Sequence, residues 1–332
     1  MRYRIPVLLL LVLLIPVAPT YGSQINPPLS FNGSSAYNYL VEQCDFGPRP
    51  PGSQNLSDCR QFIRSDLESQ GWIVSLQNFT YRDTGCSNII ARWTNSSSPP
   101  LLLGAHYDTR PNATADVGAN KTKPILGAND GASGTAVLLE LARTLPESVR
   151  SLVELVFFDA EDSGDINGWA WIRGSTYYVS ELSASRKSSI HAMILVDMIG
   201  DANLQIPKES SSTDSLQNDV WNIADSLGYS GVFLDSGGYS VLDDHSPFLN
   251  AGVPALDLIQ VPFPWYWHTL EDTPDKCSNE SLQVVGRVLE SFISEYNTES
   301  STYALDQPYL LYGLLVVFSL LVLSIVYLRL KR

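Results

Sequence analysis

Two adjacent carboxylates, Glu161 and Asp162, follow residues 152–158 (LVELVFF), an apolar run with the composition of a buried strand. Neighbouring carboxylates can divide two tasks, because one can move protons while the other holds a cation. Four more residues stand at similar boundaries between an apolar run and a turn: His106, Asp130, Asp197 and His268. Zinc accepts imidazole nitrogen and carboxylate oxygen as ligands. These residues together predict a metal site.

Taken singly, each candidate ligand also has a structural explanation, because an Asp at a strand end often caps a turn and His268 beside Trp267 could be a packed histidine. Five candidate ligands at equivalent boundaries favour the metal site instead. Asp108 lies two residues after His106 and could orient its imidazole by accepting the second N–H. Ordinary turn formation explains Asp108 equally well, so both roles stay open.

The elements that must position these residues alternate between strand and helix patterns. Apolar runs rich in β-branched or aromatic residues predict strands at residues 71–81, 88–94, 101–106, 152–158, 192–200 and 253–259. Apolar residues at helical spacing predict helices at residues 134–145, 177–182, 214–227 and 285–296. The alternation predicts a single α/β domain of three layers, with a mostly parallel central sheet flanked by helices. In such sheets ligands bind beyond the carboxyl ends of the strands, where the candidate ligands would lie.

The two ends of the chain predict export and a membrane anchor. Residues 1–22 carry Arg2 and Arg4 before an apolar run, as a signal peptide or an N-terminal anchor does. A domain over residues 23–296 is followed by a polar stalk at 297–308. Residues 309–328 carry no charge and match the ~20 residues of a transmembrane helix. The basic residues of 329–332 then predict a cytoplasmic tail and an extracellular domain.

Composition narrows the classes of partner. The net charge of −14 argues against binding nucleic acid or an anionic lipid surface. Seven N-x-Ser/Thr sequons fit an exported glycoprotein. The four cysteines include no CxxC pair, which argues against thiolate ligation of zinc. An oxidising compartment would permit two disulfides, in any of three pairings.

Six ordered motifs carry a family resemblance: GAHYD, GANDGASGTAVLLELAR, VFFDAED, LVDMIGD, DDHSPFLNAGVPALDLI and YWHTLEDT. Together they resemble the zinc-dependent exopeptidases of metallopeptidase family twenty-eight, and most closely the glutaminyl cyclase branch that shares their fold. The resemblance runs from about Phe46 to Phe292. It implies peptide or protein N-termini as substrates and one or two zinc ions as cofactor.

The aminopeptidases of this family imply a site with two zinc ions. One ion would be held by His106 and Asp197 and the other by Asp162 and His268, with Asp130 as the bridge. Glu161 would then be the base that takes a proton from water.

The resemblance to the cyclases implies one zinc, held by Asp130, Asp162 and His268. It also implies a different role for Glu161, which would move a proton from the α-amine to the departing ammonia. Asp197 and Asp244 would form a hydrogen-bonded carboxylate pair that stabilises the developing charge. Trp267 would line the substrate pocket.

Two features favour the cyclase branch: the DDHSPFL motif and Trp267 directly before His268. GANDGASG and VDMIGD resemble the peptidases at least as closely, so a di-zinc aminopeptidase is the alternative. An inactive, receptor-like ectodomain is a second alternative, although it would have no need of the full ligand set. Asp162 departs from the family, which commonly has Glu there, and Ala105 stands where animal cyclases tend to have a cysteine.

Overall fold

The computed structural model describes residues 29–94 and 98–297. The predicted signal or anchor at 1–22, the transmembrane segment at 309–328, the tail at 329–332 and all of the stalk except Asn297 lie outside the described residues. Within them, no helix is both long enough and apolar enough to cross a bilayer.

The centre of the domain is a six-stranded sheet in the order β1-β2-β4-β3-β5-β8. Its strands are β1 (Ile73–Tyr81), β2 (Thr84–Arg92), β3 (Leu101–His106), β4 (Val153–Phe158), β5 (Ala192–Asp197) and β8 (Ala255–Ile259). Strands β4, β3, β5 and β8 pair in parallel, while β2 is antiparallel to both β1 and β4. The predicted parallel sheet is confirmed for these four strands, and the hairpin forms its antiparallel edge.

The β1–β2 hairpin turns more tightly than the sequence suggests. Only Arg82 and Asp83 lie between the strands, both with left-handed backbone (φ 46° and 62°). Two such residues match the twist of paired strands, so the second strand begins at Thr84 rather than at the predicted residue 88.

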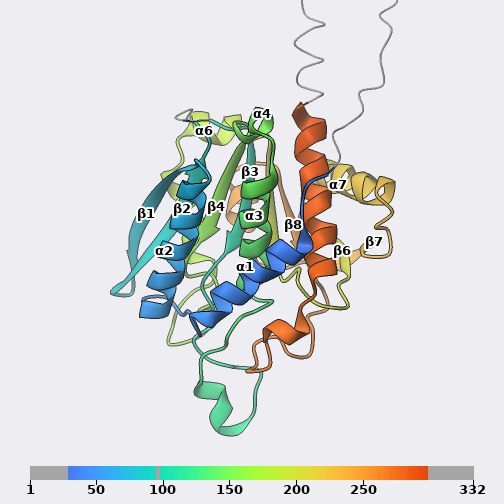
Figure 1. Ribbon diagram of the computed structural model, residues 1–332. Coiled ribbons are helices and arrows are strands. Elements are labelled where there is room, and N and C mark those ends of the chain that lie inside the picture. The colour runs from blue at the N-terminus through green and yellow to red at the C-terminus, as the bar shows by residue number, and fades with distance from the viewer. Residues whose placement is uncertain (1–28, 95–97, 298–332) are drawn as a thin grey trace, which may run out of the picture.

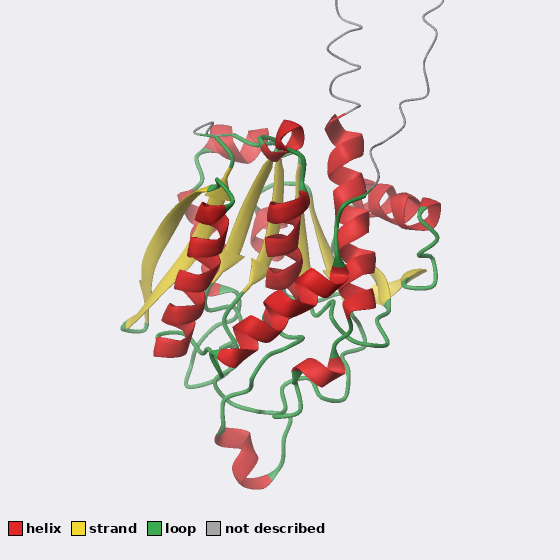
Figure 2. Ribbon diagram, viewed as in Figure 1, coloured by secondary structure: helices red, strands yellow, loops and turns green. Residues whose placement is uncertain are grey.

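Helices cover both faces of the sheet and make the three predicted layers (Figure 1, Figure 2). One face packs against α1 (Gly33–Asp45), α2 (Gln54–Ser69), α3 (Ala132–Thr144), α7 (Asp214–Ser226) and the helix over residues 279–297. The other face packs against α5 (Arg173–Glu181) and α8 (Ser246–Asn250). Shorter elements complete the domain: α4 (Glu147–Arg150), α6 (Ala184–Ser189), η1 (Gly118–Thr122), η2 (Pro274–Lys276) and the parallel pair β6 (Ile206–Glu209) and β7 (Phe233–Tyr239).

The central strands bury side chains on both faces, which explains their continuous apolar runs. In β3, Leu101 and Leu103 enter the larger core while Leu102 enters the smaller one. In β4, Phe157 and Phe158 divide in the same way. Burying a side chain of this size is worth roughly 1.5–3 kcal/mol, so both layers hold the sheet in place.

The four cysteines of the sequence are buried and form no disulfide in the described part of the chain: Cys44, Cys59, Cys86 and Cys277. The expectation that an oxidising compartment would allow two bridges is therefore not met here. Burial raises the pKa of Cys59 to about 11, which keeps its thiol protonated at neutral pH.

Candidate active site

The carboxyl ends of the parallel strands bring the predicted ligands together, as the doubly wound arrangement requires. Two groups of three buried side chains form there: His106, Asp130 and Asp197, and Asp130, Asp162 and His268. Within each group, one ligand atom from each residue lies within 4.8 Å of the others. Five residues that are far apart in sequence thus converge on one small volume.

Asp130 belongs to both groups and directs one oxygen toward each histidine. Its Oδ1 lies 3.3 Å from His106 Nε2 and its Oδ2 lies 3.4 Å from His268 Nε2. His106 Nε2 also lies 3.1 Å from Asp197 Oδ1, and His268 Nε2 lies 3.2 Å from Asp162 Oδ1. Each imidazole nitrogen therefore faces two carboxylates, as a shared cation site would require.

Asp130 is positioned by its own backbone rather than by a strand. The backbone N–H groups of Asn129 and Asp130 donate to the buried carboxylate of Asp272, at 2.8 and 3.1 Å. Gly131 follows with φ 110°, and α3 begins at Ala132. An added Cβ at Gly131 would lie 2.5 Å from the carbonyl oxygen of Asp108, so only glycine fits this sharp entry to the helix.

Three non-glycine residues beside the ligands have left-handed backbone: Ala160 (φ 60°), Met198 (φ 48°) and His268 itself (φ 56°). This region is costly for residues with a Cβ, and such conformations cluster at functional sites where the fold enforces them. Each of the three turns the chain sharply where a ligand must point inward.

Asp108 lies beside the site, and its clearest contacts are with backbone. It accepts hydrogen bonds from the N–H groups of Glu161 and Asp162, at 3.0 and 3.3 Å. Its Oδ1 lies 3.6 Å from His106 Nδ1, which is longer than a hydrogen bond. Asp108 thus fixes the turn that presents both carboxylates, while its orienting role toward the imidazole stays a prediction.

Glu161 stands apart from both ligand groups and lines the cavity in front of them. Its Oε2 lies 3.9 Å from His106 Nδ1. Burial raises the pKa of Glu161 well above its usual range, and the carboxylates of Asp162 and Asp243 add to the rise. A raised pKa is typical of carboxyl groups that act in proton transfer.

The cavity in front of the ligands holds about 190 Å³. Its walls combine carboxylates with three aromatic side chains, Trp171, Phe263 and Trp267. Trp267 stacks on His268 with ring centroids 3.6 Å apart and on Phe263 at 4.5 Å. Clefts for small molecules usually measure ~300–1,000 Å³, so this one suits a single residue at the end of a chain.

The structure places Asp243, rather than Asp244, in the cavity wall together with Asp197. Burial and the nearby Asp197 raise the pKa of Asp243 to about 7. Asp244 is buried: its side chain accepts a hydrogen bond from Ser175, and its N–H donates to Asp243 Oδ1 at 2.6 Å. Asp243 thus shares the cavity wall with Asp197, and the predicted pairing of Asp244 with Asp197 stays a prediction.

Sequence reasoning missed five residues at the site: Arg110, Trp171, Asp243, Phe263 and Asp272. Asp272 is the penultimate residue of the quoted motif YWHTLEDT, and Asp243 begins the motif DDHSPFLNAGVPALDLI, so those motifs contained the signal. Arg110 and Trp171 lie in loops without a periodic pattern, where spacing says nothing about which side chains turn inward.

The residues present fit a divalent cation. Asp162 Oδ2 is buried and has no hydrogen-bond partner among the described residues. Burial and the neighbouring Asp130 raise the pKa of Asp162. Burial lowers the pKa of His268, but Asp162 and Asp130 outweigh it and raise that pKa to about 9. Carboxylates crowded in this way gain from a bound positive charge, and an imidazole–carboxylate set suits zinc.

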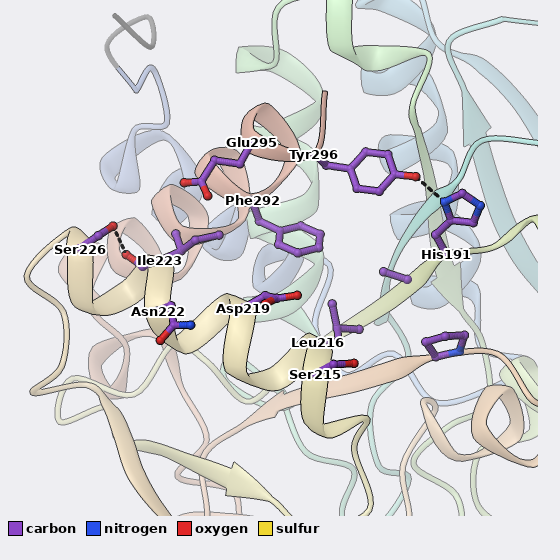
Figure 3. A pocket seen from close by; sticks show the side chains of 12 residues that line it. His191, Ser215, Leu216, Asp219, Asn222, Ile223, Ser226, Phe292, Glu295 and Tyr296 are labelled. Carbon is purple, nitrogen blue, oxygen red and sulfur yellow. Dashed lines mark hydrogen bonds between the residues drawn. The ribbon is translucent and has the colours of Figure 1, made fainter. Parts of the chain in front are cut away.

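A larger hollow lies elsewhere, between α7 and the helix over residues 279–297 (Figure 3). This groove holds about 730 Å³ and mixes polar with apolar side chains. His191 Nδ1 lies 2.5 Å from the hydroxyl of Tyr296 at one side of it. Neither group of candidate metal ligands among the described residues lies in this groove.

Proteins with similar sequences and similar solved structures include glutaminyl cyclases and a zinc-dependent exopeptidase. Glutaminyl-peptide cyclotransferase from Bos taurus is 28% identical over 291 residues, covering 75% of this chain and 78% of the bovine one. A crystal structure of Porphyromonas gingivalis glutaminyl cyclase has a TM-score of 0.75 and 32% identity, covering 80% and 99% of the two chains. A Zn-dependent exopeptidase from Parabacteroides distasonis has a TM-score of 0.72 and 29% identity, covering 81% and 99%.

The sequence model of peptidase family M28 matches residues 88–293, a span that contains both ligand groups and the cavity. Because this match covers more than half of the 332 residues, the chain belongs to peptidase family M28.

Proposed function

We propose that this enzyme is a zinc-dependent glutaminyl-peptide cyclotransferase, which converts an N-terminal Gln to pyroglutamate and releases ammonia. The observation that carries the proposal is the convergence of Asp130, Asp162 and His268 beside a small cavity with an aromatic wall. Cyclotransferases and cyclases among its relatives support the choice of reaction. The relative described as a Zn-dependent exopeptidase supports zinc as the metal.

Asp130, Asp162 and His268 would hold the zinc ion. Bound there, zinc would act as a Lewis acid on the γ-amide carbonyl of the substrate. Glu161 would take a proton from the α-amine as the nitrogen attacks the carbonyl carbon of the side-chain amide (Cδ), and would pass it to the amide nitrogen that leaves as ammonia. Its pKa, raised by burial, suits both halves of that transfer.

Two side chains would position the substrate. Trp267, stacked between His268 and Phe263, offers a rigid face against the Gln side chain. Asp243 shares the cavity wall with Asp197, and we assign to this pair the stabilising role that the sequence suggested for Asp197 and Asp244. Trp171 also lines the cavity, and its ring stacks on His268 with 6.1 Å between the ring centroids.

A di-zinc aminopeptidase is the second candidate, because one specific observation favours it. Asp130 offers a separate oxygen to each histidine, and His106, Asp130 and Asp197 form a second complete ligand group. In that reaction Glu161 would take its proton from water instead. The inactive ectodomain is disfavoured, since the chain keeps all five candidate ligands and Glu161 in place.

A Gln-initiated peptide separates the two reactions. Cyclisation releases ammonia and leaves the peptide backbone intact, whereas aminopeptidase action releases free Gln. Mass spectrometry of the products and an ammonia assay distinguish them, and a Glu-initiated peptide of the same length is the control. Free Gln without pyroglutamyl peptide would overturn the cyclotransferase proposal. Zinc analysis adds a second reading, with one ion per chain expected for the cyclase and two for the peptidase.

The placement of the enzyme outside the cell, held by a C-terminal anchor, is also part of the proposal. It rests on the apolar segments 1–22 and 309–328 and on the sequons. Protease protection of sealed cells that express the full chain tests it: the domain should be degraded by added protease. A protected domain would contradict the orientation.

A further inference from the structure

Arg110 makes the closest ionic contact to a candidate zinc ligand. Its Nη1 lies 2.9 Å from Asp162 Oδ1, and only 5% of its side chain is exposed. Among the ion pairs of residues 29–94 and 98–297, this is the only one that joins an arginine or lysine to Asp130, Asp162, Asp197 or Glu161. Burying a permanently charged side chain costs free energy, so the contacts of Arg110 must offset that cost.

The rest of the guanidinium group holds the turn that follows Asp162. Nη1 also approaches the Asp162 carbonyl oxygen at 3.4 Å, and Nη2 donates to the Gly164 carbonyl at 3.2 Å. Nε donates to Thr114 Oγ1 at 2.9 Å. A planar fork with fixed donors can hold such a turn rigidly, which a lysine cannot do.

The same group supports the aromatic wall of the cavity. The guanidinium carbon lies 4.6 Å from the centre of the Trp171 ring. Trp171 packs directly on Gly164, where an added Cβ would lie 2.0 Å from the indole. Arg110 therefore contacts both the candidate ligand Asp162 and Trp171, whose ring stacks on His268 with 6.1 Å between the ring centroids.

We infer that Arg110 is a positioning residue that holds the short Asp162 side chain in its metal-binding orientation and braces Trp171 beside it. One carboxylate oxygen is engaged by the guanidinium, and Oδ2 is left without a partner in the described structure. Asp is one methylene shorter than the Glu common in the family, so it has less reach to correct a misplaced carboxylate. The guanidinium group of Arg110 fixes the orientation of this shorter carboxylate instead.

Zinc affinity tests this inference, because the charge of Arg110 and its positioning of Asp162 should change the affinity in opposite directions. If the positive charge of Arg110 dominated, removing it would tighten zinc binding. If positioning dominates, as we infer, Arg110→Met should weaken zinc binding by roughly 10–100-fold, the range typical of groups that orient metal ligands. The dissociation constant is measured on the purified protein by competition with a chromogenic chelator, without any substrate.

Three further variants make the result specific. Arg110→Lys keeps the charge but loses the fork, so it should also weaken binding, by less than Arg110→Met; it serves as the main test if Arg110→Met fails to fold. Arg60→Met is the matched control, since Arg60 lies 3.6 Å from buried Asp159, outside both ligand groups. Its zinc affinity should stay within twofold of the unchanged protein.

In a protein that already carries Asp162→Ala, the added change Arg110→Met should raise the zinc dissociation constant by less than threefold, because Arg110 acts through Asp162. Tighter or unchanged binding in Arg110→Met and Arg110→Lys would overturn the inference, as would full additivity with Asp162→Ala. Because binding is read without substrate, a protein that binds zinc as expected but does not cyclise Gln would count against the proposed reaction alone.

Discussion

Two hollows in the described part of the chain contrast with each other, because the larger one lacks the chemistry that the smaller one gathers. The groove between α7 and the 279–297 helix holds about 730 Å³, and the cavity at the strand ends holds about 190 Å³. The small cavity gathers buried carboxylates and an imidazole from separate strands and loops, while the groove is lined largely by two helices. Convergence of distant segments, rather than volume, marks the functional site, because only convergence can place several charged groups within reach of one ion.

Removing the shared ligand should abolish the function of the small cavity. Asp130→Ala removes a carboxylate from both ligand groups at once, so that His106 and His268 each face one carboxylate fewer. We expect loss of bound zinc together with loss of all measurable turnover. Metal analysis of the purified variant and a product assay measure both. Retention of zinc at the original stoichiometry would show that the ion is held elsewhere.

Glu161→Gln should separate chemistry from metal binding within the same cavity. Glu161 belongs to neither ligand group, so zinc content should be unchanged. Turnover should fall by about 10²–10⁴-fold, the usual contribution of a positioned proton-transfer group. Steady-state kinetics with a Gln peptide provides the measurement. Turnover near the original level would remove the proton-transfer role from Glu161.

Metal-free protein should lose stability as the pH rises, because of carboxylates around the small cavity. Burial raises the pKa of Asp243 and of Asp272 from 3.8 to about 7. For a carboxyl group shifted upward, the stabilising contribution is complete below pH 3.8 and is lost as the pH rises through about 7. For one isolated group this amounts to at most roughly 4 kcal/mol.

Urea unfolding of the metal-free protein at pH 5 and pH 8 provides the test. The higher pH should give the lower free energy of unfolding, and Asp272→Asn should make the difference smaller. Equal stability at both pH values would contradict the assigned direction.

A substitution in the groove should have the smallest effect on zinc affinity, turnover and stability. Asp219→Ala changes an exposed side chain of α7 that lines the groove. Zinc affinity and turnover should stay within twofold, and the free energy of unfolding within about 0.5 kcal/mol. A larger loss of turnover would mean that the groove contributes to the reaction, and the contrast between the two hollows would have to be redrawn.

Much of the fold follows from the sequence because the central strands are buried on both faces and read as continuous apolar runs. The candidate ligands His106 and Asp197 end such runs and were predictable for that reason. Arg110 and Trp171 were not, since loops impose no period on their side chains. Asp243 and Asp244 are neighbours of the same type, and only the local turn decides which one faces the cavity.

The direction in which the parallel strands run has a practical consequence. Their arrowheads point toward the end of the molecule that carries η1, while the last described turn of the 279–297 helix, red in Figure 1, lies at the other end. A solid support attached through the C-terminal side would therefore leave the cavity mouth open to the medium. Immobilised in this way, the protein would present the strand ends and the candidate ligands to peptides in solution.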